Sequence, residues 1–226
     1  MLAALVSPID SIALDLFSVH MVQHMLLMVV GAPLLLAGAP VRPLLRGLPA
    51  GFRRGVVRPL ARARAVRATL HALRLPLVAA GLYVAGLYAW HVPAVYDAAV
   101  ENATLHVVEH LWFLGTALLF WSVVIDPVPF RGTLPYAARI VYLLLVGAAQ
   151  NTILGGLLSF STRLFYTHYA GRTAAFGIDP VTDQRLGGVI MWVPGDLIFL
   201  TAASFSFFYW LQSEEQAQRL RESRTR

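Results

Sequence analysis

The chain has 226 residues, of which 58% are hydrophobic and only 13% are charged, and its mean hydropathy is +0.64. A soluble domain carries about 25% charged residues, so this composition excludes an ordinary soluble domain. The absence of cysteine excludes disulfides and thiolate metal sites. All 18 basic residues are arginines, and in so apolar a chain their positions report membrane topology first. No nucleic-acid partner is therefore predicted.

Five apolar segments are long enough to cross a bilayer, which takes roughly 20 helical residues. They cover residues 12–39, 75–95, 105–125, 137–160 and 187–211. These segments predict an all-α, polytopic bundle of about five transmembrane helices, forming a single integral membrane domain over residues 1–226. Residues 2–8 resemble the last turns of an earlier span, for which missing upstream helices or a misassigned start codon would each account.

Arginine sets the predicted orientation. The link of residues 40–74 holds nine arginines and no acidic residue, so the positive-inside rule places it in the cytoplasm. The tail of residues 212–226 carries four more arginines and lies on the same side after four further spans. The N-terminus is therefore predicted outside and the C-terminus in the cytoplasm. The link itself is either a topology-setting loop or a basic amphipathic helix that lies on anionic lipid.

Six of the seven histidines then fall on the outer side, and His71 in the link is the exception. Five of the six lie at the outer ends of three predicted helices: His20, His24, His91, His106 and His110. The stretches HMVQH and HVVEH each place two imidazoles at positions i and i+4, on one helical face. Ionisable residues inside a membrane are functional candidates, because burying them there is costly. The pattern therefore predicts a metal or haem site on the outer side.

Copper, as Cu(I), is the metal that the residues favour. Imidazole suits zinc, copper, iron and nickel, whereas thioether ligands select Cu(I). Met25 and Met28 lie beside the first histidine pair and are predicted as further ligands, although methionines at helical spacing are usually core packing. Gln23, Glu109 and Asp183 are predicted to orient the ligands through hydrogen bonds.

Two other sites fit the same histidines. Haem is the first alternative, because histidines from different helices can supply its two axial ligands. The second is zinc, because HVVEH matches the H-x-x-E-H pattern of one metallopeptidase class, with Glu109 as the general base. That pattern is short, and no third carboxylate ligand stands nearby. A protein that carries copper needs no catalytic step, so an enzyme is not predicted.

Four stretches carry a family resemblance: FSVHMVQHMLLMVVGAPLLLAGAP, RPLLRGLP, LYAWHVPAVYDAAVENATLHVVEHLWFL and GIDPVTDQRLGGVIMWVPGDLIFL. In this order they resemble the CtaG-type cytochrome c oxidase assembly factors, polytopic bacterial membrane proteins whose usual members have about two more N-terminal helices. The resemblance falls on these residues: His20, Gln23, His24, Trp90, His91, Pro93, His106, Glu109, His110, Asp183, Gln184, Trp192 and Pro194.

What the resemblance implies is a chaperone-like role in building the copper centre of a haem-copper oxidase. It implies a multi-pass protein of the bacterial cytoplasmic (inner) membrane, with an oxidase subunit and a periplasmic or membrane copper donor as expected partners. A direct copper carrier, a membrane scaffold and a partner in copper import would each fit the resemblance.

Overall fold

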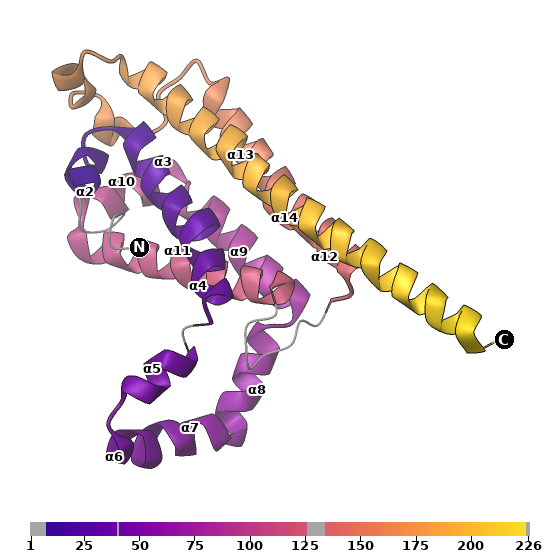
Figure 1. Ribbon diagram of the computed structural model, residues 1–226. Coiled ribbons are helices and arrows are strands. Elements are labelled where there is room, and N and C mark those ends of the chain that lie inside the picture. Colours follow the sequence, from indigo (N-terminus) through magenta and orange to yellow (C-terminus); the bar gives the residue numbers. More distant parts are fainter. Residues whose placement is uncertain (1–7, 40, 126–133, 225–226) are drawn as a thin grey trace.

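The computed structural model describes residues 8–39, 41–125 and 134–224, and every regular element in these ranges is a helix (Figure 1). Four helices are long and apolar enough to cross a membrane, or five if a bent pair counts as one span. This confirms the predicted all-α bundle of about five spans. Its orientation in the bilayer stays a prediction. Most of the predicted remnant of an earlier span lies outside the described residues.

The first span is one continuous helical rod, Phe17–Ala37, preceded by the short helix α2 (Pro8–Ala13). It consists of α3 (Phe17–Met25), the wider π-helical turn η1 (Leu26–Gly31) and α4 (Ala32–Ala37). It begins five residues later than the sequence predicts, because the chain turns between α2 and α3. Wide π turns inside helices are frequent at functional sites, and this one begins two residues after His24, the last residue of the HMVQH stretch.

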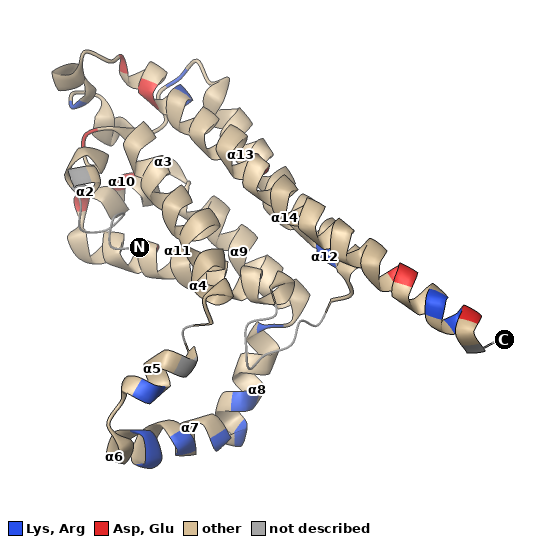
Figure 2. Ribbon diagram, viewed as in Figure 1, with Lys and Arg blue, Asp and Glu red and all other residues tan. Residues whose placement is uncertain are grey.

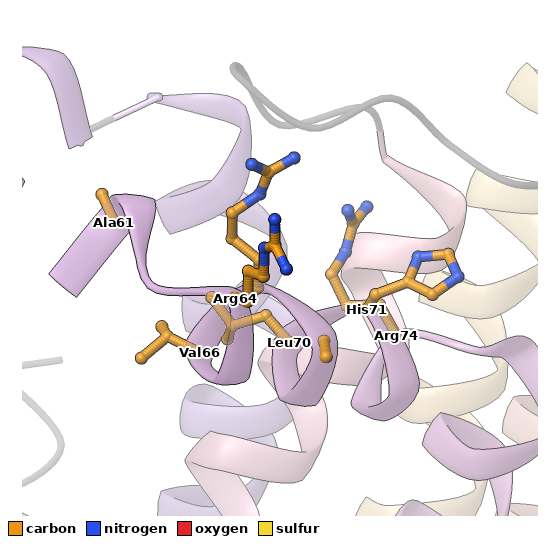
Figure 3. A pocket seen from close by; sticks show the side chains of 8 residues that line it. Ala61, Arg64, Val66, Leu70, His71 and Arg74 are labelled. Carbon is orange, nitrogen blue, oxygen red and sulfur yellow. The ribbon is translucent and has the colours of Figure 1, made fainter. Parts of the chain in front are cut away.

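The arginine-rich link is helical and lies beyond one end of the bundle (Figure 1). Its helices are α5 (Val41–Gly47), α6 (Ala50–Phe52), η2 (Arg53–Val57), α7 (Arg58–Arg62) and α8 (Arg64–Leu73). Figure 2 shows arginines along these helices and no acidic residue among them. Along α8 and just after it, Arg64, His71 and Arg74 line a hollow of about 820 Å³ and extend to the same side of the helix (Figure 3). Arg74 also ties the link to the bundle, because its guanidinium donates to the Ser122 carbonyl at 2.9 Å.

The second span differs most from its prediction. Helix α9 (Pro76–Trp90) is bent by 66° from α8 and ends five residues before the predicted end of the span. Pro93 then opens α10 (Pro93–Glu101), so most of residues 96–104, between the predicted second and third spans, are helical. Proline suits the first position of a helix but cannot continue the preceding one, because it lacks an N–H. His91 therefore lies at a break between two helices.

Helix α11 (Ala103–Val124) begins two residues earlier than predicted. The reason is local, since the Asn102 side chain accepts hydrogen bonds from the Thr104 and Leu105 N–H groups at 3.0 and 3.1 Å. Such a cap satisfies backbone donors that the first helical turn leaves free. The cap brings the whole HVVEH stretch into regular helix.

The last two spans form a close pair joined by residues 160–179, which are called the outer loop below after the side that the topology predicts for them (Figure 1). They comprise α12 (Tyr136–Tyr142), η3 (Leu143–Ala148), α13 (Ala149–Ser159), the loop turns η4 (Thr167–Tyr169) and η5 (Thr173–Phe176), and α14 (Pro180–Arg224). A Cβ on Gly188 would lie 2.6 Å from the Ser159 backbone nitrogen, so glycine lets α13 and α14 touch. Helix α14 continues through the predicted tail to Arg224 and projects past α12 (Figure 1).

Buried side chains form two hydrophobic clusters that fix the spans around the histidines. One cluster includes Phe113, Phe120 and Phe199, and the other includes Phe17 and Tyr166. Through these contacts α14 packs against α13 and α3, while α9 packs against α11. Helix α11 also packs against η1 and α4, which continue α3, so the first, second and third spans lie together as the site prediction requires.

Candidate metal centre

Helices α3 and α11 bring two histidine pairs face to face. The ring centroids of His20 and His24 are 4.3 Å apart, as are those of His106 and His110. Across the helices, His20 is 5.1 Å from His106 and His24 is 5.2 Å from His110. These four residues are called the histidine cluster below. The predicted convergence of the two pairs is present, and metal binding by them stays a prediction.

His20 lies at the centre of the histidine cluster and is completely buried. Its Nε2 is 2.9 Å from Nε2 of His24, and its Nδ1 is 3.2 Å from the Tyr169 hydroxyl. The Tyr169 hydroxyl is also 2.9 Å from that of Tyr96 and donates to the Ala13 carbonyl at 3.2 Å. Burial raises the pKa of Tyr169, so this hydroxyl keeps its proton. A hydrogen bond to the second ring nitrogen is how proteins commonly orient a metal-binding histidine.

The two tyrosines were not anticipated from the sequence. Tyr96 comes from α10 and Tyr169 from the outer loop, 73 positions further along the chain. The loop is docked on α10 by Asp97, whose carboxylate accepts from the Thr167 N–H at 3.1 Å and the Thr167 hydroxyl at 2.7 Å. Tyr96 stands in one of the stretches that carry the family resemblance and Tyr169 in none, but no spacing links either to His20, so only the tertiary structure reveals their contact with it.

Glu109 faces the histidine cluster from α11. Its side chain is completely buried, and its Oε1 lies 3.9 Å from Nε2 of His24. Among the described residues, neither carboxylate oxygen has a hydrogen-bond partner. Burying a carboxylate without a partner costs several kcal/mol, so a nearby cation would stabilise the site.

Two sets of ligand atoms are close enough to hold one ion. One comprises His20, His106 and His110, and the other comprises His20, His24 and Glu109; within each set the ligand atoms lie within 4.8 Å of one another. His20 belongs to both sets. The arrangement can therefore offer a cation either three nitrogen donors or two nitrogen donors and one carboxylate oxygen.

His91 stands beside the histidine cluster and belongs to neither ligand set. Its Nδ1 donates to the Leu87 carbonyl at 2.7 Å, which leaves the lone pair on Nε2. In the described chain Nε2 is buried and has no hydrogen-bond partner. His91 and His24 both border a small cavity, which is also lined by Met25 and Met28. The same cavity is lined by Met21 and Met191, which the predicted ligand set does not include.

The remaining predicted residues belong to neither ligand set. Gln23 is completely buried on α3. The Asp183 carboxylate, from α14, accepts hydrogen bonds from the Phe17 N–H at 2.6 Å, the Ser18 N–H at 3.2 Å and the Ser18 hydroxyl. Asp183 therefore holds the first turn of α3, just before His20. Gln184 binds the outer loop instead, at the backbone of Arg163 and Phe165.

A groove gives access to the histidine cluster from the side of α11. It has a volume of about 550 Å³ and is bordered by His106 and His110 among mostly apolar residues, with Glu101 at its edge. The other outer histidine, His168, is outside the cluster, and its Nε2 lies 3.0 Å from the Leu14 carbonyl. The cluster is thus buried on the α3 side and open on the α11 side.

The fold and site define a helical multi-pass membrane protein with a buried, carboxylate-bearing histidine cluster. The family described as cytochrome c oxidase caa3 assembly factor (Caa3_CtaG) matches residues 1–213, and the chain belongs to this family. This agrees with the resemblance carried by the histidine-containing stretches.

Curated relatives are found in mycobacteria. Uncharacterized proteins of Mycobacterium bovis and Mycobacterium tuberculosis are each 33% identical to this chain over 184 residues, or 78% of this chain and 27% of each relative. A Mycobacterium leprae protein is 28% identical over 206 residues, or 89% of this chain and 31% of that protein. The chain thus spans about a third or less of the length of these relatives. No solved structure matches it.

Proposed function

We propose that this protein binds Cu(I) at the histidine cluster and helps deliver it to a haem-copper oxidase. The observation that carries the proposal is the convergence of four imidazoles and the buried carboxylate of Glu109, which has no hydrogen bond among the described residues. Family membership supports a role in oxidase assembly, and the chemistry of the donors supports copper as the cargo.

The donors favour copper over the two alternatives. Haem would need two axial imidazoles on opposite faces of a porphyrin, but the imidazoles of α3 and α11 contact one another directly at 5.1 and 5.2 Å. Zinc would need only the histidines and Glu109 as ligands. The thioethers next to His24 and His91 suit Cu(I) and have no role in a zinc peptidase. We therefore propose a carrier without catalytic activity.

Delivery requires that the ion can leave. The groove beside His106 and His110 provides a route on which a donor or an oxidase subunit could exchange ligands with the site. The predicted topology places this groove on the outer side of the bacterial cytoplasmic membrane, where a periplasmic or membrane copper donor would meet it. An incompletely saturated ligand set at this groove favours transfer over permanent storage.

The test is metal analysis of protein purified from copper-supplemented membranes, with absorption spectra of the same samples. The double variant His20→Ala/His110→Ala removes one imidazole from each helix, and we expect it to hold one copper fewer per chain than the wild type. His71→Ala, in the link, is the matched control and should hold as much copper as the wild type. Size-exclusion profiles and helical content would establish that each variant is folded.

Each other outcome overturns the proposal in a different way. A Soret band lost in the double variant would identify a haem protein. Zinc instead of copper, with peptide cleavage abolished by Glu109→Gln, would identify a metallopeptidase. Equal copper in the folded double variant and the wild type would show that the histidine cluster is not the site. Delivery is tested by comparing the copper content of the oxidase in cells that carry the wild-type protein with that in cells that carry the double variant.

A further inference from the structure

A second, smaller cavity lies next to the histidine cluster. Its volume is about 10 Å³, and four methionines line it: Met21, Met25, Met28 and Met191. The chain contains five methionines, so every methionine after Met1 borders this one cavity. Leucine, valine and alanine fill the other buried aliphatic positions of the described residues, so filling space does not by itself call for methionine here.

The cavity is the right size for a single ion. A volume of about 10–15 Å³ accommodates roughly one water-sized sphere. Three of the four methionines are buried, and the fourth, Met25, is packed against the hydrophobic core. Thioether sulfur is a soft ligand that selects Cu(I) over zinc or magnesium. The lining therefore suits one soft monovalent cation.

Two imidazole nitrogens are available at this cavity. His91 and His24 both line it, and both side chains are more than nine-tenths buried. Within the described ranges, Nε2 of His91 and Nδ1 of His24 have no hydrogen-bond partner. In the neutral imidazole of His91, Nε2 carries the lone pair, because Nδ1 donates to the Leu87 carbonyl. His24 Nε2 lies in the histidine cluster, which leaves Nδ1 for the second cavity.

A polar network connects the cavity to a negative charge. Asn151, another lining residue, donates to the Met191 carbonyl, and its Nδ2 is 3.3 Å from Oδ1 of Asp196. A Cβ on Gly195 would lie 2.3 Å from Asn151 Nδ2 and 2.7 Å from Met25 Cε, so glycine gives both side chains their room. The Asp196 carboxylate would balance the charge of a monovalent cation in a region of low dielectric.

We propose that this methionine chamber, formed by the four methionines with His24 and His91, is a second Cu(I) site distinct from the histidine cluster. His24 borders both sites and is the point of transfer between them. The transfer is a ligand exchange: bonds from copper to the cluster imidazoles break as bonds to thioether sulfur form, and copper remains Cu(I). This inference rests on the proposed function, because the thioethers beside His24 support Cu(I) as the ion in both.

The experiment is an anaerobic titration of the purified full-length protein with Cu(I), using the chromophoric chelator bicinchoninate as competitor. We expect two Cu(I) ions per chain in the wild type. Met28→Leu/Met191→Leu keeps the volume of the side chains but removes two thioethers, and it should bind one Cu(I). His20→Ala/His110→Ala leaves every chamber residue intact and should also bind one. X-ray absorption should then show sulfur ligation in the histidine variant and none in the methionine variant.

The outcomes separate the two proposals. If the methionine variant binds as much Cu(I) as the wild type, the chamber is ordinary packing and this inference is overturned. If the histidine variant binds as much as the wild type while the methionine variant loses its copper, the proposed cluster site fails and the chamber stands. If the wild type binds no Cu(I), both fail. Should the methionine pair not fold, Met28→Leu alone, in which Cu(I) affinity should fall at least tenfold, decides the question.

Discussion

Replacing Asp183 by asparagine tests whether a side chain from the last span holds the helix that carries His20 and His24. The Asp183 carboxylate is completely buried and accepts hydrogen bonds from two backbone N–H groups and a hydroxyl at the start of α3. The asparagine side chain would keep one acceptor oxygen, lose the negative charge, and turn an NH₂ group toward donors that need an acceptor.

The cost can be estimated from these contacts. A hydrogen bond to a charged group contributes about 1.5–3 kcal/mol, and at least one such bond is lost. A negative charge at a helix N-terminus adds about 0.3–1 kcal/mol, and up to about 2 kcal/mol in buried geometry. We therefore expect Asp183→Asn to lower the free energy of unfolding by about 3 kcal/mol, a large part of the roughly 5–15 kcal/mol of a typical domain.

Asp179 provides the matched control, because it caps the start of α14 in solvent. Its carboxylate accepts from the Thr182 N–H at 3.0 Å and from the Thr182 hydroxyl at 3.2 Å. Asparagine caps exposed helices as well as aspartate does, so Asp179→Asn should cost only a few tenths of a kcal/mol. Urea titrations in detergent, followed by tryptophan fluorescence, measure both values. Equal losses in the two variants would refute the assignment of Asp183 as the anchor of α3.

Three further predictions concern packing and topology. Gly188→Ala should lower the free energy of unfolding by about 1–3 kcal/mol, because its Cβ meets the backbone of α13, whereas Gly156→Ala, with nothing within 4 Å, should not destabilise. Trp121→Phe should cost about 1–3 kcal/mol more than Trp112→Phe in the same titration, because Trp121 Nε1 donates to the Met28 carbonyl at 2.9 Å in the buried core. A fluorescent protein fused after residue 226 should fluoresce and an alkaline phosphatase fusion there should be inactive; the opposite result would invert the predicted topology.

Hydropathy predicts that the spans exist, but it does not predict the residues at which they end. The sequence places the end of the second span at residue 95, yet α9 ends at Trp90. Residues 91–95 are apolar apart from His91, so hydropathy averaged over a window cannot detect the break that Pro93 imposes. The helical link shows the same limit, because the positions of its arginines predict a side of the membrane and say little about backbone conformation.

The histidine cluster was predictable because its information is local. Spacing of four residues puts His20 with His24 and His106 with His110, and neighbouring spans then need only to pack together. Asp183 and Tyr169 act across 165 and 149 positions of sequence, respectively. No periodicity encodes such contacts. The sequence places Met191 in the fifth predicted span, but its position at one cavity with Met21, Met25 and Met28 depends on the packing of α14 against α3.

The first and fourth spans each contain a wide π turn close to residues that line the methionine chamber. Leu26–Gly31 begins directly after Met25, and Leu143–Ala148 ends three residues before Asn151. A π turn adds a residue to the helical turn and so rotates everything beyond it relative to what precedes it. Met28 lies within the first π turn, and its carbonyl is satisfied by the Trp121 indole rather than left to the helix alone. Met25 lies directly before this turn and Met28 lies within it, and both line the chamber together with Met21 and His24 of α3. The irregular turn therefore begins where the chamber and the histidine cluster meet, next to His24, the residue that borders both.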